Sequence, residues 1–192
     1  MTRGPLIVLS GPSGSGKSTV IDKLLERTRL PLHLAVSATT RRARPGEKEG
    51  EDYHFLEQAQ FEELLRQDAF LEHADVLGNC YGTLRREVDP HRDLGKGVLL
   101  EIDVQGAEQI RRRCPDAVTV FLRASSLRAY EERLRSRGTE DEAALQRRLA
   151  GARGELEHAN DYKYTVINDD LDQAVADLER IVQRSFEEAN HA

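Results

Sequence analysis

The sequence predicts an α/β fold in which a parallel β-sheet is flanked by helices on both faces. Short apolar runs alternate along the chain with segments whose apolar residues recur at helical spacing, the pattern of successive strand–helix units. The first apolar run also leads through a loop of small residues directly into a helical pattern, as LIVLSGPSGSGKSTVIDKLL over residues 6–25. These two observations place parallel strands at the centre and helices outside.

The first strand is expected over Leu6–Leu9, because a short run of branched apolar residues suits a strand buried on both faces. The loop after it has the spacing G-x-x-x-x-G-K-[ST], whose glycines are Gly11 and Gly16. A loop that ends at a helix N-terminus favours an anion, so this one is predicted to hold a nucleotide's phosphates, as in the P-loop NTPase type of fold. Lys17 supplies a charge to the outer phosphates, and the Ser18 hydroxyl is placed to bind Mg²⁺.

The remaining elements follow in order. Further strands are expected at Val98–Ile102, Val118–Leu122 and Tyr164–Ile167, with a short strand near Leu34–Ser37. Helices are expected near 17–27, 105–113, 126–136, 141–158 and 171–188. The last of these carries an apolar stripe that is predicted to pack on the core, made of Val175, Leu178, Val182 and Phe186.

A chain of 192 residues is expected to form a single domain with two additions to its core. Residues 1–36 and 97–192 carry the strand–helix pattern of the core. Residues from about 37 to 96 are polar with short alternating pieces, which predicts a small α+β insertion. The charged, glycine-containing link RSRGTEDE, Arg135–Glu142, predicts a short mobile lid over about 135–150. An insertion and a lid beside a phosphate loop indicate parts that close over substrates.

The composition indicates a soluble globular protein, with 39% hydrophobic residues, 32% charged residues and a formal net charge of −6. This charge argues against nucleic acid as a partner, and the apolar runs fall short of the roughly 20 residues of a membrane span. The start of the chain is expected to be too short for a signal peptide. Cys80 and Cys114 lack metal-ligand spacing, which predicts thiols in a reducing cytoplasm. The sequence is compatible with a homo-oligomer.

A second anion site is predicted within the insertion, in SATTRRARPGEKEGEDYHF. The planar fork of arginine binds phosphate in a bidentate manner, so Arg41 and Arg44 are candidates, with Tyr53 further along the same segment. The alternative for this run of charge is a solvated basic turn. Because such a second anion site would be unexplained in a plain GTPase or ATPase switch, that class of protein is disfavoured.

Two acidic residues close the strand expected at Val98–Ile102, namely Glu101 and Asp103. P-loop enzymes place a Mg²⁺-linked carboxylate at the end of such a strand, and open α/β sheets bind their ligands at this edge. The alternative is a favourable negative charge at the N-terminus of the helix that follows.

Six segments resemble the guanylate kinase family, in its order and at its spacing, over Pro5 to about Glu188: GPSGSGKST, VSATTRRARPGEKEGEDYHF, FLEHADVLGNCYGT, LEIDVQGA, RGTEDEAALQRRL and VINDDLDQA. The phosphate loop is shared by many NTPases, whereas the arginine–tyrosine segment and GNCYGT are far more specific. The resemblance implies a cytoplasmic enzyme that transfers the γ-phosphate of ATP to GMP, giving ADP and GDP, with Mg²⁺ accompanying ATP.

The resemblance also implies the roles of individual residues. Catalytic roles fall to Lys17, Arg41, Arg133, Arg137 and Arg148. ATP would be bound by Gly11, Pro12, Ser13, Gly14, Ser15, Gly16, Lys17, Ser18, Thr19 and Asn168. GMP would be bound by Ser37, Arg41, Arg44, Tyr53, Glu72, Tyr81, Thr83, Glu101 and Asp103. Metal contacts would come from Ser18 and Asp103.

The residue types of the implied base site suit guanine. Its N1–H and exocyclic amino group are adjacent donors that the Glu72 carboxylate can accept from, and its O6 can accept from the hydroxyl of Ser37 or Thr83. Adenine would instead set a lone pair against the carboxylate. Unmatched buried polar groups of this kind discriminate strongly between substrates.

Three positions depart from the patterns of the family. Glu101 stands where aspartate is common, Cys80 where a second tyrosine occurs, and Val104 where tryptophan occurs. The longer side chain of Glu101 leaves two roles open, an outer contact to Mg²⁺ or a contact to a substrate-binding arginine.

Two other functions remain as alternatives. A ribose bisphosphate kinase has a similar GPSGSGK opening, but it has no need of the guanine-reading side chains. A non-catalytic guanylate-kinase-like binding module typically lacks an intact phosphate loop, whereas this chain has both Lys17 and Ser18. The six histidines are scattered and are predicted to have surface or structural roles.

Overall fold

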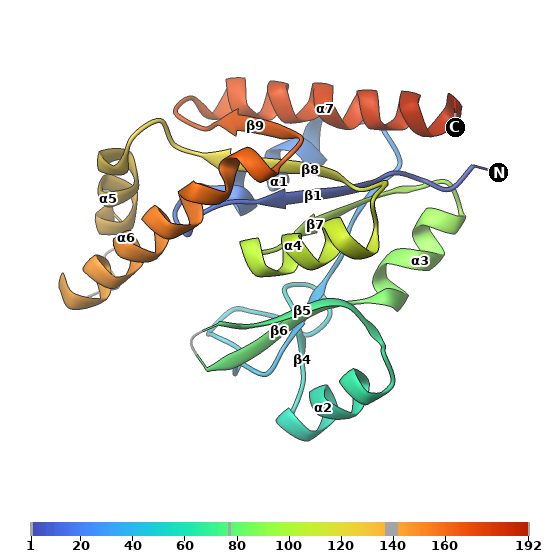
Figure 1. Ribbon diagram of the computed structural model, residues 1–192, viewed down its shortest axis with the longest axis horizontal. Helices are drawn as coiled ribbons and strands as arrows, with labels where there is room; N and C mark the ends of the chain where they lie inside the picture. The colour runs from blue at the N-terminus through green and yellow to red at the C-terminus, as the bar shows by residue number, and fades with distance from the viewer. Residues whose placement is uncertain (1, 77, 137–141, 192) are drawn as a thin grey trace.

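The computed structural model describes residues 2–76, 78–136 and 142–191. Its central sheet has five strands in the order β2-β7-β1-β8-β9, and every neighbouring pair is parallel (Figure 1). The strands are β1 (Leu6–Ser10), β2 (Leu32–Leu34), β7 (Gly97–Glu101), β8 (Val118–Arg123) and β9 (Tyr164–Ile167). This arrangement confirms the predicted α/β fold with a parallel sheet.

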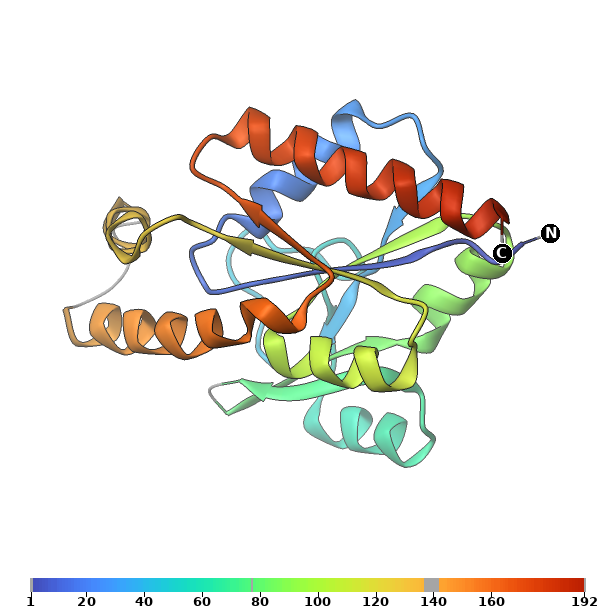
Figure 2. The same cartoon turned by 45° about the horizontal axis from the view of Figure 1, so that its top comes forward.

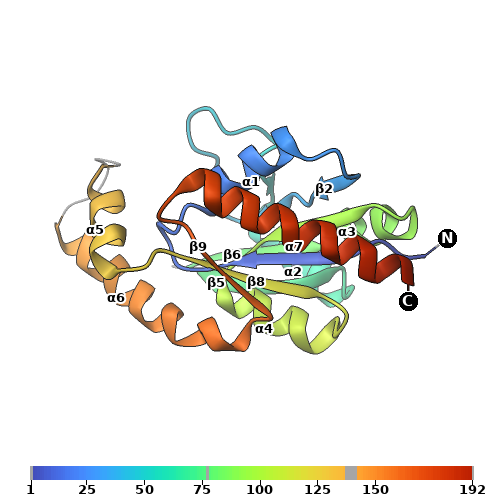
Figure 3. The ribbon, with the colours of Figure 1, turned by 90° about the horizontal axis from the view of Figure 1, so that it is seen from above.

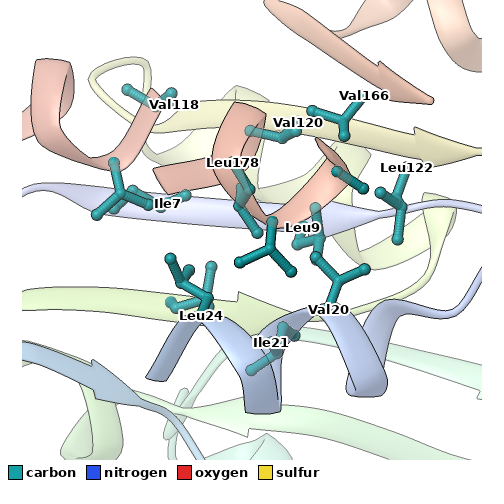
Figure 4. Close-up of a cluster of buried hydrophobic side chains, with 14 residues drawn as sticks. Ile7, Leu9, Val20, Ile21, Leu24, Val118, Val120, Leu122, Val166 and Leu178 are labelled. Atoms are coloured by element: carbon teal, nitrogen blue, oxygen red, sulfur yellow. The ribbon is translucent and has the colours of Figure 1, made fainter. Parts of the chain in front are cut away.

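Helices cover both faces of the central sheet (Figures 2 and 3). On one face, α1 and α7 pack against Ile7 and Leu9 of β1 (Figure 4). On the other face, side chains of α3 and α4 pack with Leu6 and Val8. Because successive strand residues point to opposite faces, β1 is buried throughout, as its apolar run predicts. These helices are α1 (Lys17–Arg27), α3 (Arg85–Asp93), α4 (Val104–Arg113) and α7 (Leu171–His191).

The register of the central strands determines where the site lies. Leu9 pairs with Glu101 of β7, and Ser10 pairs with Phe121 of β8. The carboxyl ends of these parallel strands therefore meet at one edge of the sheet. The loop after β1 and the residues after β7 leave from this edge, which is where open α/β sheets bind ligands.

A second sheet lies within residues 37–84, with its strands in the order β4-β3-β6-β5. β6 is antiparallel to both β3 and β5, and β5 packs against α4 (Figure 1). A separate small core holds this sheet to α2, with the rings of Phe61 and Phe70 stacked at 4.4 Å between centroids. The elements are β3 (Ser37–Thr39), β4 (His54–Phe55), α2 (Gln58–Arg66), β5 (Phe70–Val76) and β6 (Asn79–Leu84).

Two helices extend beyond the end of the central sheet, α5 (Leu127–Ser136) and α6 (Glu142–Glu157) (Figure 3). They lie side by side, and a short 3₁₀ turn, η1 (His158–Asp161), joins α6 to β9. The start of α5 and the end of α6 agree with the sequence-based prediction to within one residue. Part of the predicted lid, residues 137–141, lies outside the described residues.

The prediction of a single short strand near Leu34–Ser37 is wrong. Instead, two strands lie here: β2 (Leu32–Leu34) belongs to the central sheet, and β3 (Ser37–Thr39) belongs to the second sheet. Between the two strands Ala35 is buried and donates its N–H to the Leu99 carbonyl at 3.0 Å, whereas its neighbours are only partly buried. In the part of the chain that the structure describes, no helix is long and apolar enough to cross a membrane.

Candidate active site

The loop between β1 and α1 depends on glycine for both its backbone and its space. Gly11, Gly14 and Gly16 all have positive φ, at 144°, 88° and 90°, a region that other residues rarely adopt. A Cβ at Gly11 would stand 2.1 Å from the Leu122 carbonyl oxygen, and one at Gly16 would stand 2.5 Å from the Asn168 side chain. The loop therefore packs closely on β8 and on the residue after β9, so its path is held on both sides.

Lys17 and Ser18 begin α1 at the end of this loop. The Lys17 ammonium group donates to the Gly11 carbonyl at 2.6 Å, so it lies along the loop. The Ser18 hydroxyl donates to Oε1 of Glu101 at 2.9 Å. No acidic residue occupies the first turn of α1, so its positive dipole end is not offset within the helix. The arrangement favours phosphate at this end of the helix.

Two predicted residues brace the loop at Ser15. Asn168, which follows β9, donates from its side-chain amide to the Ser15 carbonyl at 2.7 Å. Arg133 of α5 donates to the same carbonyl at 3.2 Å and also to the backbone carbonyl of Asn168. The structure thus brings Arg133 and Asn168 together at the phosphate loop, although they are far apart in the sequence.

The helix α6 brings a further predicted arginine to the loop and adds a carboxylate that sequence analysis missed. Arg148 donates to the Ser13 hydroxyl. Glu155 is half-buried, and burial raises the pKa of its carboxyl group, while the charge of Lys17 acts in the opposite direction. A single glutamate in a charged helical segment has no sequence feature that would indicate a functional role. Arg137 lies outside the described residues.

The predicted second anion site is organised around Glu47, which sequence analysis did not single out. The carboxylate of Glu47 forms two hydrogen bonds of 2.9 Å with the Arg41 guanidinium group and accepts from the Arg44 backbone N–H at 2.7 Å. The Arg41 guanidinium lies 5.3 Å from the Tyr53 ring centroid, and the Tyr53 and Tyr81 rings meet edge to face at 6.1 Å. Arginine and tyrosine side chains from three segments thus gather in one place.

Charge explains how these groups are held. The hydrogen bonds from Arg41 lower the pKa of Glu47, and the same contacts raise the pKa of Arg41. Both groups are therefore charged at neutral pH. The only local signal for Glu47 is its place a few residues after three closely spaced arginines.

Three of the four residues predicted to read guanine form one row across the second sheet. Thr83 of β6 pairs with Ser37 of β3 on one side and with Glu72 of β5 on the other. The Thr83 hydroxyl donates to Oε1 of Glu72 at 2.7 Å. Both side chains are buried, with Glu72 only 3% exposed. A buried carboxylate with one fixed oxygen is a specific acceptor for a polar ligand.

Burial raises the pKa of the Glu72 carboxyl group to about 7, and the negative charge of Asp103 acts in the same direction. The hydrogen bond from Thr83 opposes this shift, because it stabilises the charged form. Asp103 itself caps α4, accepting the Gly106 N–H at 2.8 Å. The two predicted guanine-reading carboxylates therefore lie close enough to influence each other's charge.

Glu101 lies between the two halves of the site. Its carboxylate accepts from Ser18 in the phosphate loop. On the other side, burial raises the pKa of Tyr53, and the charge of Glu101 raises it further. Glu101 therefore bonds the phosphate loop directly and acts through its charge on the arginine–tyrosine cluster.

Comparisons with known proteins agree with this geometry. The sequence profile of the guanylate kinase family matches residues 3–185. A guanylate kinase of Rubrobacter xylanophilus is 47% identical over 184 residues, covering 96% of each chain. One of Synechococcus sp. (strain JA-3-3Ab) is 46% identical over 181 residues, covering 94% of this chain and 83% of the relative.

A solved structure gives the same result for the fold. The crystal structure of guanylate kinase from Anaplasma phagocytophilum superimposes with a TM-score of 0.78 at 35% sequence identity, over 96% of this chain and 87% of that chain. With the profile match over nearly all of its length, this chain belongs to the guanylate kinase family.

Proposed function

We propose that this chain transfers the γ-phosphate of ATP to GMP, with the phosphates of ATP on the loop from Gly11 to Thr19 and GMP on the second sheet. The GMP phosphate is held by the cluster of Arg41, Arg44, Tyr53 and Tyr81. The guanine base is read by the row of Ser37, Thr83 and Glu72, with Asp103 beside it. We place the reaction in the cytoplasm, where the thiols of Cys80 and Cys114 stay reduced.

The observation that carries this proposal is the continuity of the two half-sites at the end of β7. Ser18 in the phosphate loop bonds Glu101, and two residues further on Asp103 caps α4 beside Glu72. The phosphate loop and the buried base-reading carboxylate are thus joined by the residues at the end of β7. This arrangement suits two substrates, a phosphate donor and an acceptor, whose reacting atoms must come together. Phosphoryl transfer needs this alignment more than it needs covalent catalysis.

The chemistry of the row favours guanine over other bases. With one oxygen held by Thr83, the Glu72 carboxylate can accept from the adjacent N1–H and amino donors of guanine. Adenine would present an unprotonated N1 to the same oxygen. Because the site is buried, that mismatch would leave polar groups unpaired, a penalty that can reach roughly 10⁴-fold.

During transfer, the chain's cationic groups stabilise the negative charge that spreads over the moving phosphoryl group. Lys17 would leave the Gly11 carbonyl for the outer phosphates of ATP. Arg133 and Arg148 already contact the loop and would exchange their contacts with Ser15 and Ser13 for phosphate oxygens. Arg137 belongs to the same group by its position in the sequence.

The residues present fit Mg²⁺ that enters with ATP. The Ser18 hydroxyl and the Glu101 carboxylate lie 2.9 Å apart at the N-terminus of α1, and Asp103 follows on the same strand end, so hard oxygen ligands are available. Among the described residues, no group of three or more His, Cys, Asp or Glu side chains could hold a metal ion alone. That pattern suits an ion bound partly by substrate phosphates, whose charge it neutralises when bound.

A panel of acceptors tests the proposal. ADP release from ATP is measured by a coupled assay with GMP, AMP, UMP, CMP and a ribose phosphate in turn. We expect kcat/KM for GMP to exceed that for every other acceptor by at least about 10³-fold, because of the buried base site. If a ribose phosphate serves as well as GMP, the result would favour a ribose bisphosphate kinase. If no acceptor leads to release of ADP, the result would favour a non-catalytic binding module.

A further inference from the structure

Gly106 occupies the place where the two base-site carboxylates meet the first turn of α4. A Cβ added to it would stand 2.4 Å from Oε2 of Glu72, 3.0 Å from the carboxyl carbon of Glu72 and 3.4 Å from Oδ1 of Asp103. The first of these distances is far inside van der Waals contact. The absence of a side chain at residue 106 is therefore what admits the Glu72 carboxylate to this position.

The backbone gives no other reason for glycine here. Gly106 lies within α4 and is not among the glycines with positive φ. In a helix, glycine is less favourable than alanine because it loses more conformational freedom on folding. A buried helical glycine with ordinary backbone angles is expected where another group approaches closely, and that group is Glu72.

Glu72 has little freedom to make room for a larger residue. Its other oxygen, Oε1, accepts from the Thr83 hydroxyl at 2.7 Å, and its side chain is enclosed on the second sheet. Rotating the carboxylate away from residue 106 would break that hydrogen bond at a buried position. A methyl group at residue 106 would thus displace the carboxylate.

We propose that Gly106 is a positioning residue for recognition of the base. It leaves the space in which Glu72 lies beside Asp103, so that both carboxylates face the guanine donors at a set separation. This inference rests on the proposed function, because it assumes that Glu72 reads the base of GMP.

The test is Gly106→Ala, with Gly154→Ala as a matched control. Gly154 also lies inside a helix, α6, but no atom stands within 4 Å of the Cβ it would gain. Because small displacements of a binding group cost up to roughly 10²-fold, we expect Gly106→Ala to raise the KM for GMP at least about tenfold. The KM for ATP should change less than about twofold, and Gly154→Ala should leave both constants unchanged. An unaltered KM for GMP in Gly106→Ala would overturn the proposal.

A second arm separates displacement of Glu72 from a general loss of structure. Glu72→Ala removes the carboxylate, so the double variant has room for the methyl group that Gly106→Ala introduces. We therefore expect Gly106→Ala to lower the unfolding temperature and the affinity for GMP in the wild-type background. In the Glu72→Ala background it should lower neither, and the better helix propensity of alanine should raise the unfolding temperature slightly. Equal losses in both backgrounds would overturn the proposal, even if Gly106→Ala alone folds poorly. Failure of the proposed function would appear separately, as a lack of GMP activity in the wild-type protein.

Discussion

Thr83 donates a 2.7 Å hydrogen bond to Glu72 from the neighbouring strand, and both side chains are buried in the second sheet. The bond holds one carboxylate oxygen and leaves the other beside Gly106 and Asp103. Burial raises the pKa of Glu72 to about 7, so the carboxyl group is only partly ionised at neutral pH. Hydrogen-bond donors of a bound ligand favour its charged form. This pair makes the acceptor half of the site sensitive to the identity of the base.

Replacing Glu72 by glutamine should damage GMP use far more than ATP use. Glutamine has nearly the same size, but one of its polar ends is a donor that would face the donors of guanine. We expect kcat/KM for GMP to fall by about 10²-fold or more, with the KM for ATP within twofold. Glu62→Gln, on an exposed position of α2, serves as the control. Equal losses for both substrates would contradict the assignment.

Glu72 also predicts how stability depends on pH. Its folded pKa of about 7 lies above the ordinary value of 4.5, so between these values the folded protein keeps a proton that the unfolded chain has released. The corresponding stabilisation is fully present below pH 4.5 and is lost as the pH rises through 7. Glu72→Gln cannot ionise, so between pH 5 and 8 its stability relative to wild type should increase by about 2 kcal/mol. Denaturant unfolding at both pH values measures this, and a constant difference would refute the raised pKa.

Lys17→Met should abolish most of the turnover while the chain remains folded. Methionine keeps much of the side-chain volume but removes the charge that stabilises the transferring phosphoryl group. We expect kcat to fall by about 10²-fold or more, with the affinity for GMP retained in equilibrium binding. Lys23→Met, on the part of α1 that pairs with Asp172 away from the phosphate loop, is the matched control. Near-normal kcat in Lys17→Met would rule out the role.

The arginine–tyrosine cluster should act on GMP and not on ATP. Tyr53→Phe removes one hydroxyl and should raise the KM for GMP with a modest change in kcat, because it loses binding common to ground and transition states. Arg44→Ala removes a charge that also positions the acceptor, so the KM for GMP should rise and kcat should fall. Arg42→Ala, on the exposed neighbour, is the control. If the KM for ATP rises as steeply as that for GMP, the cluster belongs to the donor side.

The parts of the site that were predictable from the residues alone are local in the sequence. The strand, loop and helix from Leu6 to Arg27 follow one another directly, so apolar pattern, glycine spacing and helix start could be interpreted together. The row of Ser37, Thr83 and Glu72 is different, because it exists only through antiparallel pairing of distant strands. Only the family resemblance named those three residues together.

The features that sequence analysis missed depend on partners far along the chain. Gly106 looks like an ordinary helical glycine until β5 places Glu72 over it. His54 fits the predicted structural role, but its partner was not predictable: the ring lies 3.1 Å from a Glu87 oxygen on α3. Glu47 is an exception, because its partner Arg41 is only six residues away, but the contact depends on how the turn between them folds back. Side-chain pairing across elements leaves no periodic signal in the sequence.

The most direct test of the whole account follows the phosphate itself. ATP labelled at its γ-phosphate is incubated with the wild-type protein, Mg²⁺ and GMP, and the products are separated. We expect the label to be recovered in GDP in a one-to-one ratio with ADP, and Glu72→Gln to slow this transfer without sending the label to another product. Label found mainly in inorganic phosphate, or transferred to AMP as readily as to GMP, would contradict it.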